Sequence, residues 1–189
     1  MNQSRFWPMQ EGINEIIATV RLHAAPMGVI CRGDRIMMAV FRSSHTASLI
    51  EETGLVVANI MHDPVIFVRA AFSDLDPDDF IEFEEAGHQV CRLSSAESWV
   101  VYRSRIDQKT EQKLLVSLEP IRIELAESTI VPINRGFNSV IEAAVHGTRY
   151  VLTRDSALKD KIDHHVDLVK RCGGERELEA LRLLQGYLS

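Results

Sequence analysis

The feature that most constrains the fold is a change of pattern along the chain: strand-like segments come first, and helical periodicity begins only after Pro132. Between about residues 11 and 127, short β-branched and apolar runs alternate with turn residues, which is typical of strands. Further on, apolar residues recur every three or four positions, as in the series Leu178, Leu181 and Leu184. Strands followed by helices predict an α+β fold and not a βαβ alternation. We expect one domain over residues 1–130 and a helical region over residues 131–189.

Several elements of the strand-rich part can be placed. Residues 27–32 and 35–42 flank Gly33-Asp34, a turn signal, and predict a hairpin. Residues 43–54 begin with hydroxyl side chains and end in a glycine, which predicts a short helix with N-cap candidates and a C-terminal glycine.

The remaining strand candidates differ in clarity. Residues 55–61 predict a buried strand, whereas residues 65–72 are compatible with helix or strand. Residues 99–106 and 114–125 predict two long strands, with Pro120 marking a bulge or an edge position in the second.

The helical region divides into three segments. Asn134 or Asn138 caps a first helix that runs through residues 143–146, and a second helix is predicted over residues 157–171. Gly173-Gly174 breaks it, and residues 175–188 form a last amphipathic helix.

Charge and cysteine usage exclude several classes of protein. The formal net charge is -6 and the isoelectric point is about 5.6, which argues against nucleic-acid binding, although a local basic patch stays open. The three cysteines are far apart and form no CxxC pair, so reduced thiols in a cytoplasmic protein are the plain interpretation. The first residues lack the pattern of a signal peptide, and no apolar stretch approaches the roughly 20 residues of a membrane span. We expect a cytoplasmic protein without membrane or nucleic-acid partners.

Two separated motifs carry a resemblance to a known family. The first is EGINEIIAT at residues 11–19, followed by AAPMGV at residues 24–29. The second is NRG at residues 134–136, followed by VIEA at 140–143 and VHGTR at 145–149. Together they resemble the N-terminal and C-terminal signatures of the family called domain of unknown function 447, and the resemblance spans nearly the whole chain.

The resemblance implies an FMN-binding split antiparallel β-barrel with a C-terminal helical region. The related proteins include flavin reductases and pyridoxamine-phosphate-oxidase-like proteins. The implied assembly is a homodimer with FMN in the subunit cleft. Three functions follow from it: an FMN-dependent oxidoreductase with a small-molecule electron donor or acceptor, a non-catalytic flavin carrier or redox sensor with a protein partner, or a barrel without flavin that serves only in assembly.

A first group of residues suits the FMN phosphate. Arg42 ends a strand, and Ser43, Ser44, His45 and Thr46 follow at the start of the predicted short helix, where unpaired N–H groups and the helix dipole favour an anion. An arginine can also bind two phosphate oxygens at once. The alternative is that Ser44 or Thr46 is only a helix cap, with Arg42 solvated; the residues alone favour this alternative, and the resemblance reverses the preference.

A second group suits the isoalloxazine ring. Small residues allow a planar ring to approach the backbone, and Pro26 and Gly28 shape that approach. The segment consists of His23, Ala24, Ala25, Pro26, Met27 and Gly28. Its alternative is an ordinary connection between two strands. His23 stands where the resemblance implies an asparagine, so hydrogen bonding to the ring would differ in this chain.

Asn59 lies within an apolar strand and needs hydrogen-bond partners. Those partners are either protein groups or the ribityl chain or phosphate of the cofactor. Asn14 and Glu15 have the same two options, with a structural role favoured. Trp99 and Tyr102 either stack on a flavin or belong to the core or a dimer contact.

The histidines of the helical region carry weaker signals. His164 and His165 are adjacent on a helix and point to different faces, which argues against a shared metal. His146, Thr148 and Arg149 form a polar cluster at the expected helix end, where they satisfy the last carbonyls or bind a substrate anion. No Ser-His-Asp order, P-loop or GxGxxG motif is present, and a flavoprotein needs none because the cofactor supplies the redox chemistry.

Overall fold

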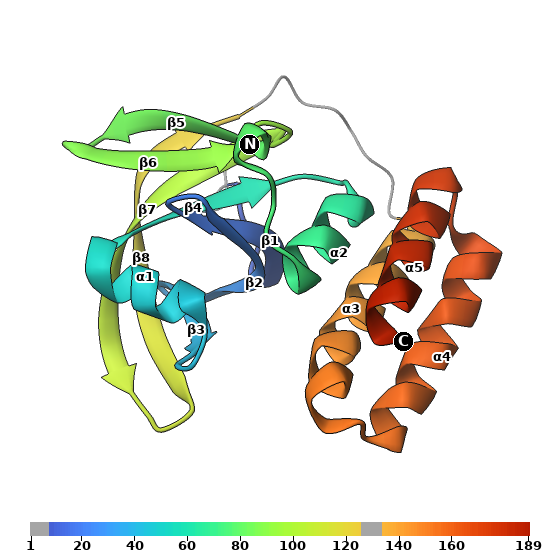
Figure 1. Cartoon of the computed structure of the whole chain (residues 1–189). Helices are drawn as coiled ribbons and strands as arrows, with labels where there is room; N and C mark the ends of the chain where they lie inside the picture. Colours follow the sequence, from blue (N-terminus) through green and yellow to red (C-terminus); the bar gives the residue numbers. More distant parts are fainter. Residues whose placement is uncertain (1–7, 126–133) are drawn as a thin grey trace. The chain divides into compact units, whose positions relative to one another are not determined.

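The computed structural model describes residues 8–125 and 134–189. Its contacts divide the chain into two compact units, residues 1–61 with 75–128, and residues 62–74 with 129–189. The expected boundary between residues 130 and 131 lies outside the described residues. The α+β prediction is confirmed, since the first unit consists mainly of strands and the described part of the second consists of helices (Figure 1).

The first unit is a closed barrel of antiparallel strands in the order β1-β2-β3-β8-β7-β4. Pairing of Ile17 with Asn59 joins β1 to β4 and closes the barrel. The strands are β1 Gly12–Val20, β2 His23–Arg32, β3 Arg35–Phe41, β4 Leu55–Ile60, β7 Ser98–Lys109 and β8 Lys113–Glu124.

Alternate residues of these strands fill the barrel interior. Ile16, Val29, Met38 and Leu114 come from four different strands and are at most 1% exposed. Tyr102 also lies in this core at 1% exposure. Burial accounts for this tyrosine, which supports the core alternative and not ring stacking.

A separate two-stranded sheet covers part of the barrel exterior (Figure 1). It consists of β5 Phe80–Glu85 and β6 His88–Leu93, preceded by the 3₁₀ turn η1 Pro77–Asp79. Val90 packs with Leu55, Val57 and Val101 on the outward faces of β4 and β7. Strands β4 and β7 are therefore buried on both faces. For β4 this agrees with the buried strand predicted over residues 55–61.

The turn predictions are confirmed. Gly33 adopts φ +59° between β2 and β3, a left-handed conformation that suits glycine. Helix α1, His45–Thr53, begins at Ser44, whose side chain accepts from the amide of Ala47, and ends at left-handed Gly54. The β7–β8 register shifts between Val101 and Tyr102, next to the position paired with Pro120, so the predicted bulge is present.

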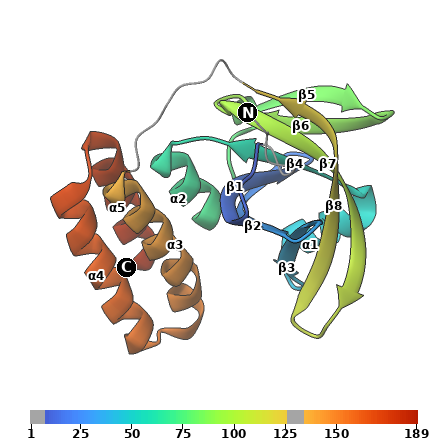
Figure 2. The same ribbon diagram turned by 180° about the vertical axis from the view of Figure 1, so that it is seen from behind.

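The second unit packs four described helices around an apolar core (Figure 2). They are α2 Pro64–Phe72, α3 Arg135–Thr153, α4 Ser156–Cys172 and α5 Glu175–Leu188. Residues 65–72, whose sequence is compatible with helix or strand, lie in helix α2. Asp63 caps it and Pro64 occupies its first turn, a position where the missing N–H costs nothing.

The ends of the later helices follow from caps and glycines. The Asn134 side chain accepts from the amides of Gly136 and Phe137, so Asn134 is the cap of α3. The expected end near His146 is wrong, because α3 continues to Thr153 and ends at left-handed Arg154. The polar cluster predicted at a helix end therefore lies inside the helix and cannot cap terminal carbonyls.

None of the helices within residues 8–125 and 134–189 is long and apolar enough to cross a membrane.

Candidate functional site

The two segments predicted to bind FMN meet at one end of the barrel. His23 opens β2 and Thr46 lies in the first turn of α1, and His23 Nε2 is 2.9 Å from Thr46 Oγ1. The rings of His23 and His45 are also close, with centroids 4.6 Å apart. Residues 23 positions apart in the sequence are therefore in contact with each other.

Thr46 differs from its neighbours because its side chain is inside the protein. It is 3% exposed, and its hydroxyl bonds to the His23 ring. The backbone N–H groups of His45 and Thr46, at the first two positions of α1, have no acceptor within the helix. Thr46 thus holds His23 in place through its side chain, and its backbone amide lies in the first turn of α1.

Ser44 is accounted for by helix capping. Its hydroxyl accepts from the Ala47 amide at 3.2 Å and donates to the Phe41 carbonyl at 2.7 Å. The cap alternative is therefore realised for this residue. Ser43 and His45 are exposed beside it at the start of α1.

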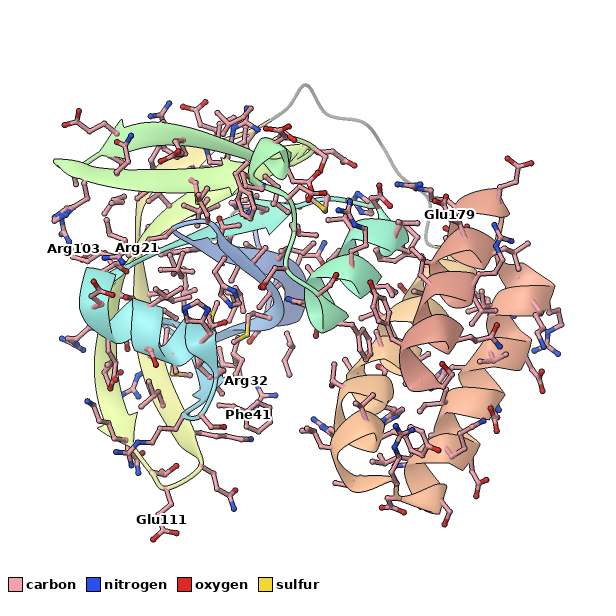
Figure 3. The ribbon with its side chains drawn as sticks, viewed as in Figure 1. Arg21, Arg32, Phe41, Arg103, Glu111 and Glu179 are labelled. Carbon is pink, nitrogen blue, oxygen red and sulfur yellow. The ribbon has the colours of Figure 1, made fainter. Side chains whose placement is uncertain are left out.

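Arg42 is exposed at the junction of β3 and α1. Its amide donates to the Gln112 carbonyl at 2.9 Å, which ties this junction to the β7–β8 turn. Its guanidinium reaches the Thr110 carbonyl at 3.4 Å, a long contact that leaves most of its donors facing solvent. The neighbouring Phe41 side chain projects from the end of β3 and is 54% exposed (Figure 3).

The segment from His23 to Gly28 is a strand, so its interpretation as a mere connection is wrong. It pairs with β1 along its whole length, from Val20 opposite His23 to Glu15 opposite Gly28. Pairing of β2 with β3 begins only at Val29. The other edge of residues 23–28 therefore has no strand partner among the described residues, and an unpaired edge presents backbone donors and acceptors outward.

The composition of this edge follows from its position. Pro26 is tolerated because an edge strand does not need every N–H. Gly28 faces β1, and a Cβ added there would lie 2.8 Å from Cγ2 of Ile13, a side chain that is 59% exposed. Met27 instead packs against the barrel core.

Asn59 is fully buried and its amide is used within the barrel. Its Nδ2 donates to the Ile17 carbonyl at 2.9 Å and to Thr19 Oγ1 at 3.0 Å. Its Oδ1 accepts from the Leu93 amide at 2.8 Å, and Thr19 donates to the Cys91 carbonyl at 2.6 Å. These bonds fasten β6 to the barrel, so structural satisfaction accounts for Asn59, and we leave it out of the candidate site.

Two further candidates have structural explanations. Asn14 exchanges hydrogen bonds with Gln10 at 2.9 and 2.8 Å, which fixes the start of β1. Trp99 packs with the apolar cluster beneath β5 and β6, and the Arg92 guanidinium lies 4.2 Å from its ring centre. Glu15 is exposed opposite Gly28 and remains beside the candidate site.

The sequence analysis missed a polar group in the helical unit. His146 and Glu142 are four residues apart on α3, and the structure brings His165 of α4 beside them. The expectation that His164 and His165 face differently is confirmed, since His164 is exposed and His165 is half-buried. The four-residue spacing was a usable signal, but the partner on α4 depends on how the helices pack.

The comparisons with known proteins agree with this architecture. Residues 14–127 match the family model "Protein of unknown function (DUF447) N-terminal domain", and residues 134–186 match "Protein of unknown function (DUF447)". An FMN-bound DUF447 protein from Methanosarcina mazei is 35% identical, with 95% of this chain and 96% of that chain covered and a TM-score of 0.89. A flavin reductase domain protein from Arthrobacter shares the fold at 14% identity, with 65% and 90% of the two chains covered and a TM-score of 0.50. The chain therefore belongs to the DUF447 family and has the split-barrel fold of flavin reductase domains.

Proposed function

We propose that this chain binds FMN and acts as an oxidoreductase of the flavin reductase-like type. The observation that carries the proposal is the crystal structure of the family member from Methanosarcina mazei, which is FMN-bound and matches this chain over 95% of its length.

The start of α1 fits the phosphate. A phosphate dianion needs cations and free backbone N–H groups, and a helix N-terminus supplies the latter. Arg42, Ser43 and His45 are exposed there, and the amide of Thr46 lies in the same turn. Arg42 is the one permanent positive charge of this group. We assign these four residues to the phosphate.

The edge of β2 fits the ring. Ala24, Ala25 and Pro26 present little side-chain bulk, and the unpaired edge offers backbone groups to the polar rim of the isoalloxazine. The bond to Thr46 fixes the orientation of His23 at the beginning of this edge. When bound, FMN supplies hydride and electron transfer, and the protein positions and tunes it.

We further propose a homodimer in the cytoplasm. Supporting the dimer are apolar side chains that the barrel leaves exposed, among them Ile13, Phe41, Leu115 and Ile123 at 38–59% exposure. A stable pair would bury more than about 1,200 Å² in total. Three free cysteines support a reducing compartment. Light scattering at micromolar concentration tests the assembly, and a monomer would contradict it.

The phosphate assignment is tested by Arg42→Ala and Thr46→Ala. Loss of a charged hydrogen bond costs about 1.5–3 kcal/mol, so FMN affinity of Arg42→Ala should fall roughly tenfold or more. Thr46→Ala should weaken binding because the hydrogen bond between Thr46 Oγ1 and His23 Nε2 is lost. Arg32→Ala is the control, since Arg32 is also exposed and lies at the other end of β2 from His23. Unchanged flavin fluorescence titrations for both variants would show that the phosphate binds elsewhere.

The redox assignment is tested on the flavin-loaded protein. Anaerobic NADH or NADPH should bleach the flavin absorbance, and an added acceptor should restore it with turnover. A yellow protein that neither donor reduces would favour a non-catalytic flavin carrier. A preparation that neither contains nor takes up flavin would contradict the proposal as a whole.

A further inference from the structure

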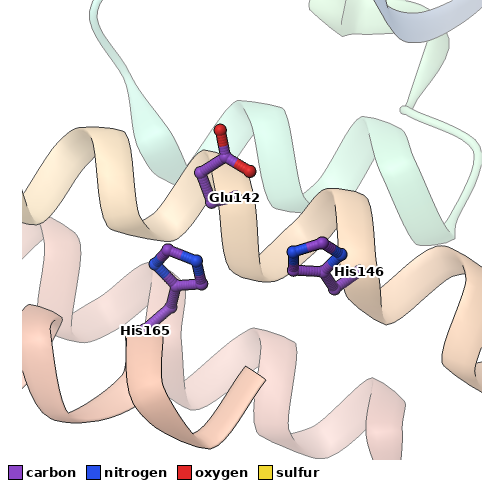
Figure 4. Close-up of side chains that lie close together, drawn as sticks. All are labelled: Glu142, His146 and His165. Carbon is purple, nitrogen blue, oxygen red and sulfur yellow. The ribbon is translucent and has the colours of Figure 1, made fainter. Parts of the chain in front are cut away.

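A second polar cluster lies in the helical unit, between α3 and α4. Glu142 and His146 are one turn apart on α3, and His165 approaches from α4 (Figure 4). Each residue offers one ligand atom, and the three atoms all lie within 4.8 Å of one another. Figure 4 shows the two imidazole rings facing each other across the gap, with the carboxylate beside them.

Hydrogen bonding within the protein does not explain why these imidazoles are placed together. Nδ1 of His146 and Nδ1 of His165 are both buried and have no hydrogen-bond partner in the described part of the chain. The ring centroids are 6.0 Å apart and the ring planes are tilted by 33°, so the two rings are not closely stacked. Buried polar atoms without partners are rare in folded proteins and call for a specific explanation.

The chemistry of the three groups suits a metal ion. Two imidazoles and one carboxylate form a ligand set that is typical of Zn²⁺ sites in which a fourth position stays open to water. Burial is the main cause that lowers the pKa of both histidines. Glu142 acts in the opposite direction on both pKa values, which places its negative charge near both rings.

We propose that Glu142, His146 and His165 bind one divalent transition-metal ion, with Zn²⁺ as the best match, and that this ion links α3 to α4. Ligand atoms around a tetrahedral zinc lie roughly 3.4 Å apart, given bonds of about 2.0–2.1 Å. Closing from the present separations therefore needs a movement of up to about 1.4 Å, which the exposed Glu142 side chain and small ring rotations can supply.

The charged surroundings limit the affinity without excluding the ion. Lys161 and Arg149 are close enough to lower the pKa of His146, after the larger effect of burial, and His164 acts likewise on His165. These cations repel a metal, and the Glu142 carboxylate opposes them. The choice of metal follows from the ligand types. With two imidazoles in the site, we expect Zn²⁺ to bind and Mg²⁺, which prefers oxygen ligands, not to bind.

The test is metal binding by the full chain without an affinity tag. After removal of metals with a chelator, Zn²⁺ is titrated in competition with a chromogenic chelator, with Mg²⁺ as the comparison ion. One Zn²⁺ should bind per chain at the cluster and raise the melting temperature, whether or not flavin is loaded. His146→Ala and His165→Ala should each weaken binding by more than the roughly 10–100-fold that loss of an outer-shell partner costs.

Two variants make the result decisive. Glu142→Gln changes only an exposed side chain, so the fold should survive, and affinity should fall at least about tenfold. His88→Ala removes an exposed histidine of β6 and should leave Zn²⁺ affinity and the thermal shift unchanged. Absence of Zn²⁺ binding at micromolar concentration, or equal affinity of Glu142→Gln and the unchanged protein, would overturn the proposal.

Discussion

Replacing Asn59 by alanine tests whether this residue serves the barrel or the cofactor. Its side chain is fully buried, and three hydrogen bonds of 2.8–3.0 Å connect it to Ile17, Thr19 and Leu93. Each such bond contributes about 1 kcal/mol net, and the amide of Leu93 would be left without this acceptor. We expect Asn59→Ala to lower the free energy of unfolding by about 3–5 kcal/mol.

Urea unfolding followed by tryptophan fluorescence measures this loss, because Trp99 packs beside β6 and reports on that region. Thr19→Val removes the hydroxyl that accepts from Asn59 and donates to Cys91. In a double-mutant cycle the two changes should be coupled by about 0.5–3 kcal/mol. Asn138→Ala, at an exposed helical position, should change stability by no more than about 0.5 kcal/mol.

The outcomes separate the two roles of Asn59. A structural role requires the same loss of stability with and without FMN, and unchanged FMN affinity in the protein that remains folded. The reasoning is refuted if Asn59→Ala costs less than about 1 kcal/mol, or if it weakens FMN binding while stability is unchanged.

Three further perturbations follow from the structure. Gly28→Val adds bulk beside β1, where the new Cβ lies 2.8 Å from Cγ2 of the exposed Ile13 side chain. Flavin occupancy should fall while circular dichroism and assembly mass stay unchanged, and normal FMN affinity would place the ring elsewhere. Gly136→Ala puts a Cβ 2.5 Å from the backbone Cα of Gly173, so the free energy of unfolding should fall by about 1–3 kcal/mol, with a lower melting temperature. An unaltered melting curve would contradict this packing. Cys172 is the accessible thiol of the three cysteines, and a thiol reagent should label it first in the native protein. Cys31 in β2 and Cys91 in β6 are buried, and burial raises the pKa of Cys91 to about 12, so rapid labelling of all three thiols would contradict this.

Much of the fold follows from local sequence patterns. The Gly33 turn, the Ser44 and Gly54 caps of α1 and the Gly173-Gly174 break all depend on residues whose backbone or side-chain chemistry acts within a few positions. The bulge beside Pro120 is of the same kind. Such features are readable because the interacting groups are neighbours along the chain.

Local patterns leave the outcome open, or predict it wrongly, where it depends on distant partners. Residues 65–72 form a helix, although their composition also suits a strand, because the helical unit buries their apolar side chains. The extension of α3 past His146 likewise rests on packing, since Gly147 sits against Phe72 and Leu184. Local propensity is a weak guide when tertiary burial is available.

The candidate site shows the same division. The phosphate segment and the ring segment are both predictions from residue types together with the family signature. Only the structure decided that the first turn of α1 contacts the start of β2 and that the Asn59 side chain is hydrogen-bonded within the first unit. It also decided that His165 lies beside Glu142 and His146. A sequence by itself determines which short segments form turns, caps, strands and helices, because those forces act between near neighbours. The tertiary structure decides which side chains meet, because burial and hydrogen bonding act between elements that the chain order alone does not bring together.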